Sequence, residues 1–221
     1  KGYEEVFATM VSAVNKAYAA IKAAIMSGEL AAGDRVKEEL IAERVGVSRT
    51  PIREALNKLT AEGFLSMPPN QGARVTDWSA QDLKEITELR AVLESYGAGI
   101  AARSISPSKL QDLDHLCDQM ESAVSKGGDQ DLEELTELNS RFHMIIIAAS
   151  GNARLVDVIG NLAHPLLVQR RFSGFGDTRL QRSMDHHREI TAALRAHDSG
   201  WASAIMRAHI LASREPDCQD G

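Results

Sequence analysis

The sequence predicts a mostly α-helical protein in two parts. Residues 1–76 are expected to form a small domain of three helices and a β-hairpin, and residues 77–221 an all-helical bundle of about six helices. Two observations lead to this prediction. Apolar residues recur at helical spacing along most of the chain, and two short strand-like segments lie together just before residue 77. From Trp78 onward no segment shows a convincing strand pattern.

The helices of the first part are short and are separated by glycines. Tyr18–Met26 and Glu38–Val45 carry apolar residues at helical spacing, and Gly46 ends the second of these segments. A third helix is expected over Ser48–Glu62, with serine as a good N-cap. Two helices joined by a short glycine-containing turn are typical of a helix-turn-helix, whose second helix enters the major groove of DNA.

The segment after the third helix has the pattern of a hairpin. Phe64–Met67 and Ala73–Thr76 are strand-like, and Pro68–Gly72 between them is rich in turn residues. A hairpin directly after a recognition helix is a wing, and a glycine near its tip allows the backbone to approach DNA closely. The sequence therefore predicts a winged helix-turn-helix, whose candidate DNA-binding residues are Ser48, Arg49, Thr50, Arg53 and Gly72.

Charge is distributed unevenly between the two parts. The chain carries a net charge of −6, which alone argues against nucleic acid. However, residues 1–76 hold 10 basic and 9 acidic residues, a net charge of +1, and residues 77–221 hold 15 basic and 22 acidic residues, a net charge of −7. A locally basic face on an acidic body suits a DNA-binding protein, although a basic cluster can also be a solvated helix face.

The N-terminal motifs resemble those of the GntR family of bacterial regulators. The similarity lies in the segment Gly46–Leu56, followed by Glu62-Gly63 and Gln71–Val75, with Gly33–Val36 upstream. The resemblance implies DNA contacts from the five candidates named above. One position departs from some family members, which have a DNA-facing arginine where this chain has Glu39. The operator sequence of those members therefore cannot be transferred.

The second part resembles the FCD-type C-terminal domain of the FadR subfamily. The similarity is carried by Glu88–Glu94, Asn139–His143, Ala149–Asn152, His187–Ile190 and Met206–His209. Helices are expected over Ala80–Ala101, Ser108–Lys126, 130–149, 153–172, 178–196 and 198–213.

Histidines in this part are candidate metal ligands. His143 follows Asn139 by four residues, so both side chains share one helix face. His187 and His209 fall on the last two helices, which a bundle can bring opposite that face. Three imidazoles and one oxygen suit zinc, with nickel as an alternative. The resemblance implies an aspartate at the position of Asn139, so the neutral amide removes one negative charge.

A small organic-acid effector is expected to complete the metal site. Arg90 matches a family position near the pocket, and Arg141 or Arg171 could add a second guanidinium for a carboxylate. Arg90 could instead form an i,i+4 salt bridge with Glu94.

These observations favour a cytoplasmic homodimeric regulator, most simply a repressor, that binds operator DNA and a carboxylate metabolite. Cys117 and Cys218 are read as free thiols, the N-terminal ten residues lack a signal-peptide core, and no apolar run could span a membrane. Two alternatives stay open. A three-histidine site can belong to a metal-dependent enzyme, although no H-E-x-x-H motif or nucleophile elbow is present, so no enzyme is expected. The metal could also be purely structural.

Overall fold

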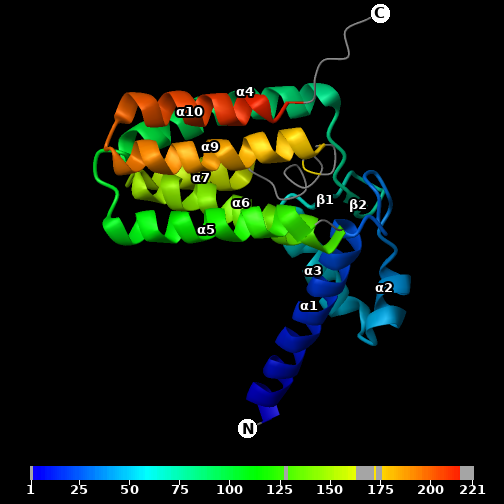
Figure 1. Ribbon diagram of the computed structural model, residues 1–221. Helices are drawn as coiled ribbons and strands as arrows, with labels where there is room; N and C mark the ends of the chain where they lie inside the picture. Colours follow the sequence, from blue (N-terminus) through cyan, green and yellow to red (C-terminus); the bar gives the residue numbers. More distant parts are fainter. Residues whose placement is uncertain (1, 127–128, 163–171, 173–175, 215–221) are drawn as a thin grey trace, which may run out of the picture. The chain divides into compact units, whose positions relative to one another are not determined.

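Figure 1 shows a computed structural model that describes residues 2–126, 129–162, 172 and 176–214. The chain divides into two compact units, Lys1–Trp78 and Ser79–Gly221. None of the helices in the described ranges is long and apolar enough to cross a membrane.

The N-terminal unit has three helices and a small hairpin, as predicted. The elements are α1 (Gly2–Met26), α2 (Glu38–Val45), α3 (Arg49–Ala61), β1 (Leu65–Ser66) and β2 (Arg74–Val75). The strands pair antiparallel, with Leu65 opposite Val75, and α1 packs against both α2 and α3. At the α1–α3 contact the Tyr18 hydroxyl donates to Glu62 over 2.6 Å, and the Lys58 ammonium lies 4.3 Å from the centre of the Tyr18 ring.

Helix α1 is longer than the sequence indicates. It begins at Gly2, whereas the prediction began at Tyr18. The prediction rested on the apolar spacing of the C-terminal part of the helix, where Ala17, Ile21 and Ile25 are buried. An apolar pattern identifies the packed part of a helix and does not indicate how far the helix extends beyond it.

The turn between α2 and α3 depends on its glycine. Gly46 has a φ of 70°, in the left-handed region, and its N–H donates to the carbonyl of Ala42 to end α2. Ser48 then occupies the N-cap position of α3, as expected, but its side chain forms no capping hydrogen bond. The hydroxyl of Ser48 is exposed instead.

The C-terminal unit is a bundle in which six helices are described, as predicted. They are α4 (Ala80–Ala101), α5 (Pro107–Lys126), α6 (Asp129–Ala149), α7 (Ala153–Leu162), α9 (Asp177–Arg195) and α10 (Ser199–Ala212). The sequence predicts a single helix over 153–172, and its described part is α7, Ala153–Leu162. Residues 163–171 of that predicted helix lie outside the described residues. Helix α4 starts at a capping box formed by Ser79 and Asp82.

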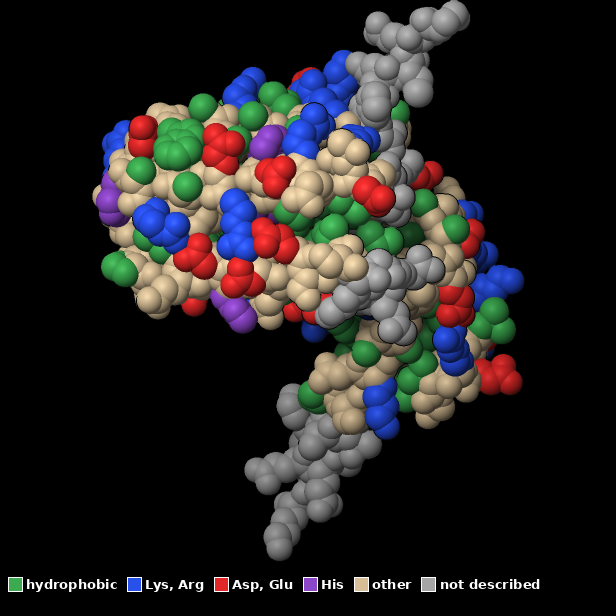
Figure 2. Space-filling model, in the orientation of Figure 1, with side chains coloured by type: hydrophobic (Ala, Val, Ile, Leu, Met, Phe, Trp, Pro, Cys, Tyr) green, Lys and Arg blue, Asp and Glu red, His purple; other side chains and the backbone are tan. Residues whose placement is uncertain are grey.

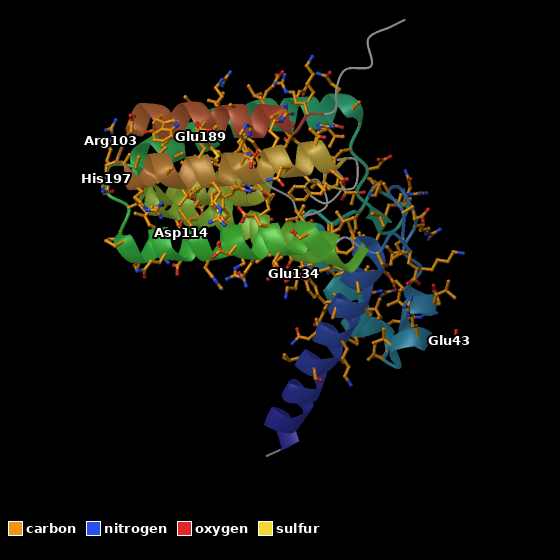
Figure 3. The ribbon with its side chains drawn as sticks, viewed as in Figure 1. Glu43, Arg103, Asp114, Glu134, Glu189 and His197 are labelled. Atoms are coloured by element: carbon orange, nitrogen blue, oxygen red, sulfur yellow. The ribbon has the colours of Figure 1, made fainter. Side chains whose placement is uncertain are left out.

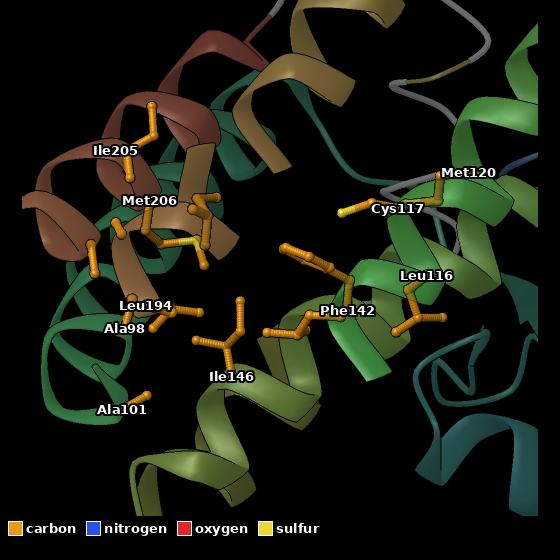
Figure 4. Packing of buried hydrophobic residues seen from close by; sticks show 14 of the residues in the cluster. Ala98, Ala101, Leu116, Cys117, Met120, Phe142, Ile146, Leu194, Ile205 and Met206 are labelled. Atoms are coloured by element: carbon orange, nitrogen blue, oxygen red, sulfur yellow. The ribbon is translucent and has the colours of Figure 1, made fainter. Parts of the chain in front are cut away.

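The core of the bundle gathers around Phe142 of α6, which is fully buried (Figure 4). Cys117 and Met120 of α5, with Leu194 of α9 and Met206 of α10, belong to the same cluster. Helix α10 packs along α4 and α9, and α5 packs along α6 and α9 (Figure 1). Burial raises the pKa of the Cys117 thiol to about 11, so this cysteine remains a neutral core residue.

Acidic and basic side chains alternate over α5 and α9 on the face shown in Figure 2. Several of them form ion pairs between these two helices. The Arg188 guanidinium bonds Glu121 at 2.6 Å and Asp118 at 2.5 Å, and Arg195 bonds Asp114 at 2.5 Å. These ion pairs join α5 to α9 across the surface of the bundle.

Candidate DNA-binding face and histidine centre

The predicted DNA-binding residues share one exposed end of α3. The opposite face of this helix is buried and includes Ile52, Leu56 and Leu59. That packing turns the polar N-terminal residues outward, and the four candidates on or beside α3 are exposed: Ser48, Arg49, Thr50 and Arg53. Four hydrogen-bonding side chains at the start of a helix match the end that a recognition helix presents to DNA.

Both arginines of this face pair with acids of α2. Arg49 lies 3.3 Å from Glu39, and the Nε of Arg53 donates to Glu38 over 3.0 Å. The two arginine side chains are 61% and 65% exposed. Exposed ion pairs of this kind contribute at most about 1 kcal/mol, so a phosphate or a guanine can replace the carboxylate.

The wing presents its glycine as predicted. Gly72 is exposed and has a φ of 73°, a conformation that favours glycine. A Cβ at this position would lie 3.4 Å from the Nε of Arg35, so the Arg35 side chain rests against the wing tip. Arg35 is exposed, and it was not a candidate from sequence because it precedes α2 and reaches the wing through the long-range Arg35–Arg74 bridge.

Three of the predicted metal ligands meet in the bundle core. His143 of α6, His187 of α9 and His209 of α10 are 2%, 0% and 7% exposed. One ring nitrogen from each lies within 4.8 Å of the others. The Nε2 atoms of His143 and His209 are 3.2 Å apart. Because two ligands of a tetrahedral zinc ion lie roughly 3.4 Å apart, this separation suits a shared metal.

The unpaired ring nitrogens also fit a metal. Among the described residues, neither nitrogen of His187 has a hydrogen-bond partner, and the Nδ1 of His209 has none. Burial, followed by the neighbouring histidines, lowers the pKa of both His187 and His209 well below the usual value. Both rings are therefore neutral at pH 7, the form in which imidazole binds a metal ion.

Glu94 of α4 connects the histidines to Arg90. Its side chain is fully buried. Its Oε2 accepts from the Nδ1 of His143 over 2.6 Å, and its Oε1 accepts from the Nε of Arg90 over 2.7 Å. Burial alone would raise the pKa of Glu94, but the positive charge of Arg90, and then the interaction with His143, outweigh burial and hold that pKa at about 2.

The contact with Glu94 determines which nitrogen of His143 is deprotonated and can bind a metal ion. A carboxylate that accepts from Nδ1 keeps the proton on that atom, so the lone pair of Nε2 points toward His209. Carboxylate–histidine pairs commonly orient a metal ligand in this way. From sequence, Glu94 was identified only as a possible salt-bridge partner of Arg90, because its contact with His143 spans 49 positions and leaves no local pattern.

The other predicted residues have different surroundings. Asn139 is 5% exposed and lies one helical turn before His143. Arg90 is buried and forms the i,i+4 ion pair with Glu94 that its spacing allowed. Arg141 is exposed on α6, and Arg171 lies outside the described residues. Of the two candidate effector-binding arginines that the structure describes, Arg90 lies beside the histidines, through Glu94, and Arg141 is exposed.

A shallow depression opens on the α9–α10 side of the histidine cluster. Its lining includes His209, His186 and two arginines, Arg179 and Arg182, and no acidic residue. Its arginines make it a candidate approach for an anion. The sequence analysis did not single out Arg179 or Arg182, because nothing in their local sequence distinguishes them from other surface arginines of α9.

Comparisons with known proteins agree with both domains. The profile of the gntR family of bacterial regulatory proteins matches residues 13–75, and the profile of the FCD domain matches residues 85–212. The Nta operon transcriptional regulator of Aminobacter aminovorans is 32% identical over 180 residues, which cover 80% of this chain and 81% of that protein. The transcriptional repressor GlaR of Escherichia coli is 28% identical and covers 88% of this chain and 90% of its own length.

Solved structures share the fold. The McbR/YncC structure from Escherichia coli superposes with a TM-score of 0.73 at 24% identity, and covers 90% of this chain and 93% of that one. A GntR regulator from Rhodococcus sp. RHA1 gives a TM-score of 0.72 at 19% identity, with 90% and 94% coverage. The named relatives are transcriptional regulators and not enzymes, which removes the metalloenzyme alternative. The chain therefore belongs to the GntR family, in the FadR subfamily, and is a transcriptional regulator with an N-terminal helix-turn-helix and a C-terminal FCD domain.

Proposed function

We propose that this regulator is a repressor that binds operator DNA through α3 and the wing and releases it when an organic acid occupies the FCD domain. The exposed N-terminal end of α3 supports the first half, because its side chains are of the types that contact phosphates and base edges. The repressor role follows the name of GlaR, one of its relatives. A homodimer would bring two recognition helices to the half-sites of a pseudo-palindrome.

The sensor is proposed to be the histidine cluster with a bound divalent metal ion, for which zinc is preferred over nickel. The single observation that carries this assignment is the meeting of three buried imidazoles whose nitrogens lie within 4.8 Å of one another. Asn139 would supply an oxygen from one helical turn away. When bound, the metal supplies a positive charge to which a carboxylate can coordinate.

The effector is proposed to be a small carboxylate, for reasons of charge. An ion held by neutral histidines and a neutral amide keeps its full positive charge, and Glu94 offsets it only from beyond His143. A carboxylate that binds from solvent would offset the remaining positive charge of the ion. Arg179 and Arg182 in the adjacent depression would favour the approach of an anion. Arg141 and Arg171 remain proposed contacts for the carboxylate.

The experiment is metal analysis by plasma emission on the wild type and on the double variant His187→Ala/His209→Ala. We expect about one metal ion per wild-type chain and a loss of nearly all metal in the variant, because two of the three imidazole ligands are removed. Asn139→Asp should bind the metal more tightly than the wild type. His197→Ala is the matched control, since His197 lies just beyond the C-terminal end of α9 and its Nδ1 donates to the backbone carbonyl of Ala102 over 2.7 Å. Equal metal content in wild type and double variant would refute the assignment.

A second arm separates a sensor from a structural metal. Operator affinity is measured by fluorescence anisotropy with and without a panel of mono-, di- and tricarboxylates, while metal content is followed in the same samples. A sensor predicts that one carboxylate changes the affinity about 5- to 150-fold while the metal stays bound. If no carboxylate acts on metal-loaded protein, the metal is structural and the effector half of the proposal is wrong.

A further inference from the structure

The segment that leads into α2 pairs with the second strand of the wing. The N–H of Gly33 donates to the carbonyl of Val75 over 3.0 Å, and the N–H of Val36 donates to the carbonyl of Ala73 over 2.9 Å. In return, the N–H of Val75 donates to the carbonyl of Asp34 over 2.9 Å. The segment therefore runs antiparallel to β2, and its backbone is fixed relative to the hairpin.

This pairing places the guanidinium of Arg35 against Gly72 of the wing. A Cβ added to Gly72 would lie 3.4 Å from the Nε of Arg35, 3.5 Å from its Nη2 and 3.8 Å from its Cζ. Because three atoms of the planar group are at similar distances, the guanidinium turns its face toward the glycine. Gly72 therefore has a second use besides its positive φ, since it leaves the space in which the Arg35 side chain lies.

The charge of Arg35 is not used within the N-terminal unit. Three of the four other arginines of this unit pair with acidic side chains, and the guanidinium of Arg74 donates to the carbonyl of Gly33 over 2.9 Å. Among the described residues, the guanidinium of Arg35 forms no hydrogen bond or ion pair, and the residue is exposed. An exposed guanidinium that is held in place and has no partner is prepared for an acceptor outside the chain.

The minor groove of DNA supplies acceptors where the wing would lie. The two grooves of B-DNA alternate along the duplex, so an element beside a helix in the major groove faces the adjacent minor groove. That groove is about 6 Å wide, too narrow for a helix. A glycine with a flat guanidinium against it is a slender element that can enter. The negative potential of a narrow, A·T-rich minor groove attracts arginine side chains in particular.

We propose that Arg35 enters the minor groove beside the wing and makes this regulator prefer A·T base pairs there. The proposal rests on the proposed function, because it requires α3 in the major groove, but it does not depend on the metal or the effector. Gly72 positions Arg35, and the guanidinium donates to adenine N3 or thymine O2. A G·C pair adds the guanine N2 amino group, which is a donor and opposes the approach of a second donor.

The test changes the minor groove of the operator while its major groove is kept. An operator is selected from random duplexes with full-length wild type, and hydroxyl-radical protection locates its minor-groove contacts. Duplexes then carry A·T, G·C or inosine·cytosine at that position, because inosine is guanine without the N2 amino group. By fluorescence anisotropy, wild type should bind the A·T and inosine·cytosine duplexes alike and the G·C duplex about tenfold more weakly. A wild type that binds inosine·cytosine no better than G·C would overturn the proposal.

Two variants at Arg35 assign the discrimination to this side chain. Arg35→Ala should bind all three duplexes equally. Arg35→Lys keeps the charge but should also lose most of the discrimination, because an ammonium is more strongly hydrated than a guanidinium. Arg44→Ala is the matched control and should keep the wild-type pattern. Arg44 follows Glu43, which Figure 3 labels on α2, and pairs with Glu29. If either Arg35 variant distinguishes G·C from inosine·cytosine as wild type does, the proposal is wrong.

The variant Arg49→Ala/Arg53→Ala, measured on the same duplexes, separates a failure of this proposal from a failure of the proposed function. If this double variant binds the operator as wild type does, α3 is not the recognition helix, and both proposals fail. If it loses binding while wild type treats inosine·cytosine and G·C alike, α3 is assigned correctly and the role of Arg35 alone is refuted.

Discussion

At the scale of single residues, the histidine centre depends on Glu94, a group that is neither a predicted ligand nor exposed. Its two oxygens are both used, one by Arg90 and one by His143. Arg90 keeps Glu94 ionised, and Glu94 in turn orients His143. The chain thus keeps one negative charge beside the centre although Asn139 is neutral. That charge acts through His143 and does not occupy a coordination position.

Glu94→Gln should weaken zinc binding by about tenfold, because the amide oxygen can still accept from His143 but the negative charge is gone. Zinc affinity is measured by competition with a chromophoric chelator. The nitrogen chemical shifts of His143 report whether its proton stays on Nδ1. Glu88→Gln is the control, since Glu88 lies on the same helix and pairs with Arg214 at the surface. An unchanged zinc affinity in Glu94→Gln would show that Glu94 has no role in positioning His143.

At the scale of helices, the two N-cap serines have different roles despite the same local pattern. The side chain of Ser79 accepts from the backbone N–H of Asp82 over 3.1 Å, and the carboxylate of Asp82 accepts from the backbone N–H of Ser79 over 2.9 Å. Ser48 occupies the same position on α3 without a capping hydrogen bond. The free hydroxyl of Ser48 is the one placed among the DNA-binding candidates.

Replacing each serine by alanine should therefore affect a different property, stability for Ser79 and operator affinity for Ser48. Ser79→Ala is expected to lower the free energy of unfolding by about 1 kcal/mol and to leave operator affinity unchanged, because it removes a cap and no DNA contact. Ser48→Ala should weaken operator binding and change stability by less than about 0.5 kcal/mol. Urea unfolding and anisotropy on both variants provide the measurements. Equal loss of stability in the two variants would contradict the distinction.

The helical elements were predictable from sequence because each one that packs shows a buried stripe and a start or stop residue. Gly46 and Ser79 are examples, since each ends or begins a helix through a backbone conformation or a cap that local sequence encodes. The start of α1 at Gly2 was not predicted, because the prediction rested on the apolar spacing of Tyr18–Met26. In the histidine centre, the i,i+4 pair on α6 was visible in the sequence, whereas the contact of Glu94 with His143 depends on how α4 and α6 pack.

At the scale of the whole molecule, charge separates the two functions of the chain. The N-terminal part carries +1 and the C-terminal part −7, so the DNA-binding surface is confined to the first domain. The acidic bundle uses many of its charges in ion pairs such as Arg188–Glu121. In a homodimer the two small DNA-binding domains would each contact one half-site, and phosphate attraction would be limited to α3 and the wing.

The most direct test of this account is operator binding by wild type and by Arg49→Ala/Arg53→Ala. An operator is first selected from random duplexes with the wild-type protein, and affinity is then measured by fluorescence anisotropy at fixed salt. Each arginine is expected to contribute about 1–3 kcal/mol, so the double variant should lose most specific binding while its circular dichroism spectrum is unchanged. Arg154→Ala/Arg207→Ala, which removes two exposed arginines from the FCD domain, should bind as wild type does. An operator affinity that is the same for wild type and Arg49→Ala/Arg53→Ala would contradict the assignment of α3 as the recognition helix.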